Sequence, residues 1–239
     1  MTQLIPLAKL INTAEFGLPF VIESLKDQVH AFIPVGQQED GNRELYNLQV
    51  TTRSPMGAIA YSQAGIFLQH GFVRILGAGR HKDIQRSIVS WTHGKFPAQE
   101  LAMKDGGTVV RPGAILIADD VLGGSFALNG GGIEGVELGH VAYYCPTQLL
   151  WDDLGFGYSA FVEVMGSPDN FMSFYQDVLW KGWEEEVAKV HGDQALSVYP
   201  PLWASASKGE TERSRKAVPV EEVYGMLHDA DTVATVRGA

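Results

Sequence analysis

Two short apolar segments joined by a glycine-containing turn constrain the fold of this chain most strongly. The segments "AILIA" (114–118) and "SFALN" (125–129) have the length and residue types of β-strands, and Gly123 and Gly124 lie between them. Parallel strands need a crossover connection of about a dozen residues or more, and this link is shorter. We therefore predict an antiparallel pair, in which Gly123 or Gly124 supplies a positive φ angle for a structural turn.

Short β-branched and aromatic runs also fill residues 48–76. They are interrupted by turn signals such as Ser54-Pro55, which predicts a meander of antiparallel strands. The run "HVAYYC" (140–145) predicts a further strand, whereas residues 91–113, rich in polar residues, glycine and proline, are assigned to a loop. Residues 48–145 are thus expected to form a mainly antiparallel central sheet.

Helical patterns flank this region on both sides. In "LPFVIESLKDQ", residues 18, 21, 22 and 25 are apolar and share one helical face. We expect residues 1–47 to form an N-terminal helical segment and residues 146–239 a C-terminal helical extension, with the polar stretch 207–216 as an exposed loop. The chain is therefore predicted to be a single α+β domain over 1–239, with helices flanking the sheet.

The clearest helix signal follows Gly166. Ser167 can accept hydrogen bonds from free amides as an N-cap, and Pro168 stands at the first helical position. The next residues place an apolar stripe on one helical face, and we expect this stripe to be buried. Its members are Phe171, Phe174, Tyr175 and Val178.

The composition favours a soluble protein with a sizeable core. Of the 239 residues, 45% are hydrophobic and 10% are aromatic. The sequence starts without a basic stretch followed by an apolar run, and no stretch of about eighteen apolar residues occurs. We therefore expect a cytoplasmic protein that does not interact with membranes. Cys145 is the only cysteine, which excludes an internal disulfide and favours a buried, unreactive thiol.

The net charge of −10 is unevenly distributed along the sequence. Residues 119–186 contain twelve Asp and Glu residues and one basic residue, Lys181, so this segment carries a formal charge of −11. A field of this sign repels the phosphate groups of nucleic acids and attracts basic proteins. The segment indicates either an acidic surface for a basic partner or a solvated face that keeps the protein soluble, and it argues against nucleic-acid binding.

No known motif assigns a cofactor to the two carboxylates of the glycine turn. Asp119 and Asp120 are adjacent and precede apolar residues, whereas a calcium loop of the EF-hand type alternates its oxygen ligands. The only Gly-Lys pair is followed by Phe96, which excludes a phosphate-binding P-loop. The histidines lack the spacing of a zinc protease, and no G-x-S-x-G elbow is present. We expect no metal and no cofactor, with Asp119 or Asp120 bonded to backbone amides of the turn.

The sequence after the predicted sheet offers a candidate recognition surface. Trp151 is followed by Asp152 and Asp153, and an exposed aromatic residue flanked by carboxylates often anchors a partner. The alternative is that Trp151 closes the core where sheet meets helix. Together with the turn carboxylates, these residues form the predicted binding set, which is Asp119, Asp120, Trp151, Asp152 and Asp153.

Three functions remain open at this point. A binding module of the immunity or regulatory type would use the acidic segment against a basic toxin or regulator. An enzyme acting on a small polar substrate would need a pocket near the sheet in which separated residues such as Asp119, Arg53 and His140 converge. A scaffold would present no specific site. The lack of a complete catalytic motif favours the binding module.

Several ordered blocks of the sequence resemble a known bacterial family. The blocks are "TTRSPMGAIAY", "GFVRILGAG", "ADDVLGGSFALNGG", "WDDLGFGYSAFV" and "SVYPPLWA…ERSRKAVPVEEVYGM", and they span nearly the whole chain from about Gln49 onward. They are similar to the family catalogued as domain of unknown function twenty-six twenty-five, which has no assigned activity. That resemblance therefore implies no particular activity for this chain.

A looser resemblance covers only residues 113–165. The order of strand "AILIADD", glycine turn, strand "SFALN", strand "HVAYYC" and helix "YSAFVEVM" resembles the SUKH superfamily. This superfamily includes Smi/Knr-type cell-wall regulators and bacterial immunity proteins against contact-delivered toxins. The resemblance implies an α+β fold that is used for binding and not for catalysis.

Overall fold

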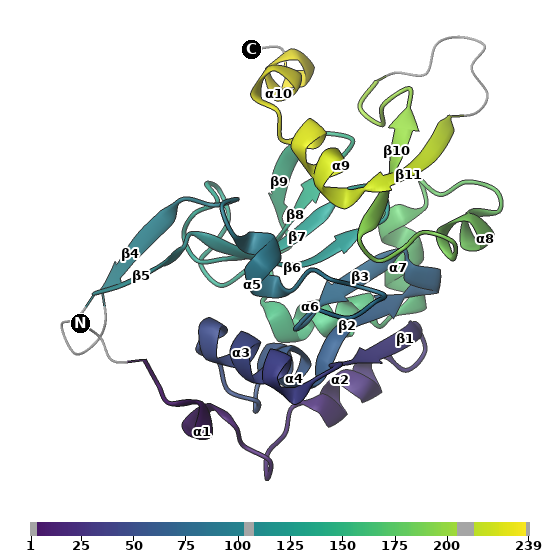
Figure 1. Cartoon of the computed structure of the whole chain (residues 1–239). Coiled ribbons are helices and arrows are strands. Elements are labelled where there is room, and N and C mark those ends of the chain that lie inside the picture. Colours follow the sequence, from purple (N-terminus) through teal and green to yellow (C-terminus); the bar gives the residue numbers. More distant parts are fainter. Residues whose placement is uncertain (1–3, 103–107, 205–212, 238–239) are drawn as a thin grey trace.

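Seven antiparallel strands form the central sheet, in the order β1-β2-β3-β6-β7-β8-β9 (Figure 1). The computed structural model describes residues 4–102, 108–204 and 213–237. The strands are β1 (Val29–Pro34), β2 (Gln63–Leu68), β3 (Val73–Leu76), β6 (Ala114–Asp120), β7 (Ser125–Asn129), β8 (Val141–Cys145) and β9 (Leu150–Asp153). The α+β class and the mainly antiparallel sheet are therefore confirmed, as is the antiparallel pairing of β6 with β7.

Two smaller hairpins and a set of helices complete the described fold. The hairpins pair β4 (Ala98–Ala102) with β5 (Thr108–Pro112) and β10 (Gln194–Tyr199) with β11 (Ser214–Pro219). The helices are α1 (Leu7–Leu10), α2 (Leu18–Leu25), α3 (Gln38–Leu48), α4 (Pro55–Ser62), α5 (Ile88–Thr92), α6 (Tyr158–Met165), α7 (Pro168–Tyr175), α8 (Trp183–Val187), α9 (Val220–Leu227) and α10 (Ala230–Arg237), with a 3-10 turn at Gln69–Gly71. Within the described ranges, no helix is long and apolar enough to cross a membrane.

The central sheet is covered on both faces. In Figure 1, α6 and α7 lie behind the sheet, and α2 packs against α6. The opposite face is covered by α5, α9 and the β10–β11 hairpin. The β4–β5 hairpin projects from the body of the protein on the left of the view. Buried apolar side chains from the sheet and from its helices form one continuous core.

The predicted meander over residues 48–76 is wrong in its first half. Residues 55–62 form helix α4, and the strands begin only at Gln63. Ser54 caps this helix, because its side chain accepts a hydrogen bond of 3.1 Å from the backbone N–H of Gly57, and Pro55 occupies the first turn. Ser-Pro therefore starts a helix here, although it was interpreted as a turn between strands.

Three other expected segments differ from the structure. Residues 91–113 are not a loop, because they contain the end of α5 and the strands β4 and β5. Residues 1–47 include strand β1 as well as helices, and residues 146–239 include β9, β10 and β11. Residues 207–212 of the expected polar loop lie outside the described residues, while Ser214 to Lys216 belong to β11. Strands therefore interrupt both segments that were expected to be helical, a single strand in the first and three strands in the second.

Helix α7 begins where the sequence predicted, but only two of the four residues in the predicted apolar stripe are buried. The Ser167 side chain accepts a hydrogen bond of 3.4 Å from the backbone N–H of Asn170. Phe171 and Tyr175 are buried, whereas the Phe174 side chain is 37% exposed and Val178, beyond the helix, is half-buried. The difference follows from the positions of these residues around the helix. Phe171 and Tyr175 are four residues apart and share the buried face, whereas Phe174 lies at the edge of that face.

We expect Phe171→Ala to destabilise the protein far more than Phe174→Ala. The ring of Phe171 packs against Phe72, Tyr175 and Trp183 with centroid separations of 5.4, 5.1 and 5.7 Å. Its removal should cost about 3–5 kcal/mol of unfolding free energy, because an enclosed cavity is left. The partly exposed Phe174 should cost clearly less. Urea denaturation of both variants measures the difference, and equal losses would contradict this packing.

The buried Glu44 should make stability depend on pH. Its Oε1 accepts a hydrogen bond of 2.7 Å from the backbone N–H of Val89, yet burial raises the pKa of this carboxyl to about 7. The folded state therefore holds a proton that the unfolded chain has already lost, so stability falls as the pH rises from about 4.5 to about 7.

Glu44→Gln removes this titration. Since one pKa unit corresponds to about 1.4 kcal/mol, the variant should gain roughly 2–3 kcal/mol relative to the wild type between about pH 5 and about pH 8. Denaturation curves at both pH values provide the measurement. A constant difference between the two proteins across this range would show that Glu44 does not titrate there.

Candidate functional site

The two carboxylates of the glycine turn point to opposite faces of the sheet. Asp119 is paired in register with Arg74 of β3, and Asp120 is paired with Val73. Because side chains alternate along a strand, Asp119 points toward α5 and the β10–β11 hairpin, and Asp120 points toward α7. Both side chains are almost completely buried, so neither contributes to an acidic surface, contrary to the expectation from the sequence.

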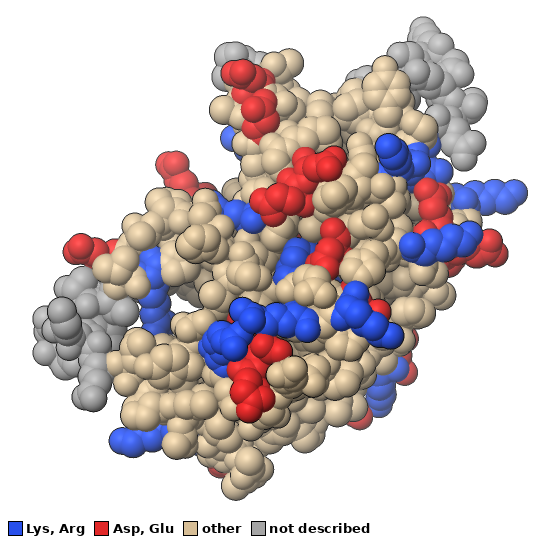
Figure 2. Space-filling model, viewed as in Figure 1, with Lys and Arg blue, Asp and Glu red and all other residues tan. Residues whose placement is uncertain are grey.

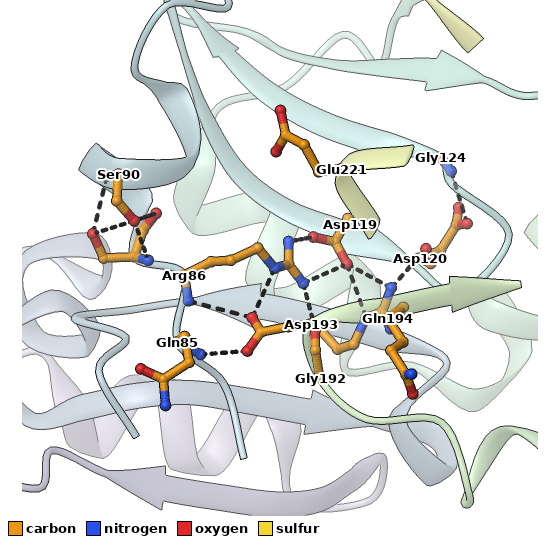
Figure 3. Close-up of polar contacts among 12 residues, drawn as sticks. Gln85, Arg86, Ser90, Asp119, Asp120, Gly124, Gly192, Asp193, Gln194 and Glu221 are labelled. Carbon is orange, nitrogen blue, oxygen red and sulfur yellow. Dashed lines mark hydrogen bonds and ion pairs between the residues drawn. The ribbon is translucent and has the colours of Figure 1, made fainter. Parts of the chain in front are cut away.

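Asp119 forms the centre of a buried network of charged side chains (Figure 3). It accepts a hydrogen bond of 2.8 Å from Nε of Arg74, and its other oxygen is bonded to the Arg86 guanidinium. Arg86 also donates to Asp193 at 3.1 Å and to the backbone oxygen of Gly192 at 2.5 Å. Arg74 in addition donates to the backbone oxygen of Gln194 at 2.6 Å. The network therefore ties β10 and the segment before α5 to the sheet.

Asp120 is satisfied by neutral donors on the other face. Its Oδ1 accepts hydrogen bonds of 2.9 Å from the backbone N–H groups of Leu122 and Gly124. Its Oδ2 accepts from the hydroxyl groups of Tyr143 at 2.7 Å and Tyr175 at 3.2 Å. Burial raises the pKa of Asp120, and burial together with this carboxylate holds the pKa values of both tyrosines well above their usual range.

Both glycines of the turn are required by this geometry. Gly123 has a φ angle of 93°, which confirms that one of the two supplies the positive φ. A Cβ atom on Gly124 would lie 2.1 Å from Oδ2 of Asp120 and 2.3 Å from the Tyr143 hydroxyl oxygen. The stretch is therefore a structural turn whose backbone binds Asp120. Within the described residues, no group of three or more His, Cys, Asp or Glu side chains could hold a metal ion.

Removal of the Asp119 charge should destabilise the fold strongly. Asp119→Asn removes the ion pair of the buried Arg74 and leaves Arg86 with Asp193 alone, and breaking a buried ion pair in this way costs about 3–5 kcal/mol. A suitable control is Glu15→Gln, which breaks the exposed ion pair of Glu15 with Arg53 and should cost less than about 1 kcal/mol. Chemical denaturation measures both changes, and a loss for Asp119→Asn no larger than the control would argue against the network.

One surface cleft brings together residues from the end of the sheet, the segment after α7 and strand β11. We call it the acidic cleft; its volume is about 590 Å³. Two exposed carboxylates, those of Asp152 and Asp177, line it beside aromatic side chains. Among the described residues, neither carboxylate makes an ion pair or a hydrogen bond, and partial burial raises the pKa of Asp152. The aromatic members of the lining are Tyr143, Phe174, Tyr175 and Trp180.

The basic residues that line the acidic cleft are held by other groups. The guanidinium of Arg213 donates to the backbone oxygens of Pro200, Pro201 and Ala204. The guanidinium of Arg215 binds Glu186 and lies 4.5 Å from the centre of the Trp180 ring. Cys145 also lines this cleft and is half-buried, so the expected fully buried thiol is not observed.

The remaining residues of the predicted binding set have other contacts. Trp151 is half-buried and packs its ring against Tyr144 at 5.2 Å and Phe96 at 5.9 Å, close to the alternative in which it closes the core. Asp153 accepts hydrogen bonds from the backbone N–H groups of Glu137 and Gly155 and contacts His140 at 3.0 Å. Of the set, Asp152 is thus the residue that lines the acidic cleft.

The residues named for a catalytic pocket are engaged in separate contacts. Arg53 forms an exposed ion pair with Glu15, and His140 contacts Asp153. Asp119 is enclosed by arginine side chains. The described contacts therefore do not join these three residues into a single site.

A second, apolar cleft of about 700 Å³ lies below the β4–β5 hairpin. We call it the apolar cleft. Figure 2 shows the surface hollowed beneath this hairpin, on the left of the view. Its walls come from the end of α3, from α5, from β5 and from the β6–β7 pair, and they include Leu48, Val89, Val110, Ile115 and Leu128. The sequence interpretation missed this cleft, because residues 91–113 were expected to form a loop.

Asp177, Tyr143 and Arg111 are further cleft residues that the sequence interpretation did not select. Asp177 belongs to the acidic segment 119–186, but its place beside Asp152 depends on the packing of α7. Figure 2 shows Lys and Arg mixed with Asp and Glu on the face it presents, so that face is not uniformly acidic. Counting charges along the sequence did not indicate which carboxylates are exposed.

The fold and its clefts define a class of α+β protein with an antiparallel seven-stranded sheet and two surface clefts of different polarity. The chain belongs to the family described as Protein of unknown function DUF2625, whose sequence profile matches residues 7–223. This match confirms the first family resemblance noted in the sequence.

Two relatives cover most of the chain. The uncharacterized protein YbfG of Escherichia coli (strain K12) is 38% identical over 222 residues, which are 92% of this chain and 94% of that protein. An uncharacterized protein of Haemophilus influenzae (strain ATCC 51907 / DSM 11121 / KW20 / Rd) is 34% identical over 195 residues, 82% of this chain and 81% of that protein. No solved structure was found to match. None of these comparisons supports the looser resemblance to the SUKH superfamily.

Proposed function

We propose that this protein is a non-catalytic binding protein that holds a basic side chain of a partner protein in the acidic cleft. The observation that carries this proposal is the position of Asp152 and Asp177, two exposed carboxylates without an ion pair among the described residues, on one aromatic-lined cleft. A basic toxin or regulator is the kind of partner that would present such a basic side chain.

The chemistry of the cleft suits lysine or arginine. The apolar stem of such a side chain can pack on aromatic rings while its charged head reaches a carboxylate. Phe174 of α7 lines the cleft and is partly exposed, so the carboxylates share the cleft with an aromatic surface. Aromatic residues are typical of interface cores, and charged groups are typical of their rims.

The groups below the cleft support binding over catalysis. Tyr143 remains protonated, because its pKa is held well above the usual range, and it therefore does not provide a general base. The oxygens of Asp120 accept four hydrogen bonds from protein donors. These groups are engaged in holding the fold, and the carboxylates of Asp152 and Asp177 are the ones available to a ligand.

Selection from a random peptide library tests the proposal. Peptides retained by the wild-type protein should be enriched in lysine or arginine. The double variant Asp152→Asn/Asp177→Asn should bind them about fivefold more weakly, because two exposed charge pairs are lost. Asp169→Asn is the matched control, since Asp169 is an exposed carboxylate of α7 that does not line the cleft. Titration calorimetry measures the affinities.

Two further measurements locate and constrain the interaction. A bound peptide should slow the alkylation of Cys145 by iodoacetamide, because this thiol lines the same cleft. Peptide affinity should also fall as the pH decreases toward the raised pKa of Asp152, because the protonated carboxyl loses its charge. Retained peptides without basic residues, or equal binding by the double variant and the control, would refute the proposal. Turnover of a small molecule by the purified protein would favour the enzyme alternative.

A partner isolated from the native cell allows the same proposal to be tested by measuring association rates. The purified protein can be used to retrieve partners at low and moderate salt concentration. Association with a genuine partner should slow with salt and with the double substitution, since rim charges mainly accelerate encounter. An association rate that is indifferent to both would exclude this electrostatic mechanism.

A further inference from the structure

Two polar side chains that line the apolar cleft, those of Thr92 and Asn129, are hydrogen-bonded within the fold. The hydroxyl oxygen of Thr92 accepts a hydrogen bond of 2.9 Å from the backbone N–H of Leu116. The side-chain oxygen of Asn129 accepts from Gly131 and Ile133, and its amide nitrogen donates to the backbone oxygen of Val136. These polar side chains are satisfied within the fold, and most of the described lining residues are apolar, so the cleft suits a ligand whose body is mainly apolar.

The titratable side chains in the described lining of the same cleft are all basic residues. Among the described residues that line it, the titratable side chains are His93 and Arg111, and no Asp or Glu is present. Both side chains are exposed, and the described part of the chain provides no ion pair or hydrogen bond to either. In a protein with a net charge of −10, a cleft without a carboxylate and with an unpaired guanidinium is suited to an anion.

The rim of the cleft also exposes aliphatic surface. Val110 of β5 is 61% exposed and Leu138 is 68% exposed, although both line the cleft. Exposed apolar side chains that line a cleft are typical of ligand-binding surfaces. A ligand that covers them must therefore be apolar over most of its length and charged at one end.

We propose that the apolar cleft binds a small amphiphilic carboxylate, with its apolar body between the β4–β5 hairpin and α3 and its head group on Arg111 and His93. The guanidinium donates two parallel hydrogen bonds to a carboxylate, and the imidazole provides a donor nitrogen in either tautomer. A volume of about 700 Å³ lies within the range of pockets that enclose small organic ligands. This site is independent of the proposed function, since the two clefts share no lining residue.

Dodecanoate and dodecanol form the probe pair, used below their aggregation concentrations. They share an apolar chain and differ in the charge of the head group. We expect dodecanoate to bind with one molecule per chain and at least about tenfold more tightly than dodecanol, which corresponds to one charge-assisted contact. Titration calorimetry gives the stoichiometry and both affinities, and dodecyltrimethylammonium, with the opposite charge, should not bind.

Variants identify the residues. Arg111→Gln should remove most of the preference for dodecanoate over dodecanol while leaving the affinity for dodecanol unchanged, and His93→Gln should reduce the preference less. Ala98→Trp, at an exposed position that lines the cleft, should weaken both ligands because it fills the space. Lys216→Gln is the control, since it removes an exposed positive charge from β11, outside this cleft.

Each outcome decides the proposal. Equal affinity for the acid and the alcohol, or an unchanged preference in Arg111→Gln, would overturn the assignment of the head group. Absence of dodecanoate binding, or binding that Ala98→Trp leaves unchanged, would overturn the site. Circular dichroism and thermal unfolding of each variant ensure that a loss of binding is compared between folded proteins. Failure of this test would leave the peptide experiments on the acidic cleft unaffected.

Discussion

Two adjacent buried carboxylates on β6, a strand in the middle of the sheet, connect the sheet to the layers on its two faces. A buried carboxylate is costly unless it is paired or hydrogen-bonded, and β6 buries two in succession. The alternation of the strand separates them, so that each finds donors in a different layer. Asp119 binds Arg74 and Arg86; Arg74 donates to the first backbone oxygen of β10, and Arg86 donates to that of Gly192, just before it. Asp120 binds Tyr175 of α7.

The acidic cleft depends on both of these connections. One wall follows α7, which Asp120 attaches through Tyr175, and another belongs to β11, which is paired with the β10 strand that Arg74 holds. The exposed carboxylates of the cleft therefore owe their positions to the buried ones. A substitution at Asp119 or Asp120 would disturb the cleft indirectly, so its effect on binding can be interpreted only together with its effect on stability.

The sequence predicts local structure well where its local signals agree. The strands of 114–145 were predicted because short connections and apolar runs agree, and Ser167 was correctly identified as a cap. Ser54-Pro55 carries the same chemistry but was interpreted as a turn, because the following "MGAIAY" is apolar throughout and has no helical period. The β4–β5 hairpin was missed for a related reason, since polar residues, glycine and proline mask the alternation of its short strands.

The sites were less predictable, because exposure depends on contacts between distant residues. Asp119 and Asp152 look alike in the acidic segment, but the partner that buries Asp119 is Arg74, 45 positions away. Asp177 and Asp152 meet only after α7 has packed on the sheet. The net charge of −10 would also not predict a cleft whose described lining contains Arg111 and no carboxylate. Both proposals therefore rest on side chains without an ion pair among the described residues, namely Asp152 and Asp177 in one cleft and Arg111 in the other.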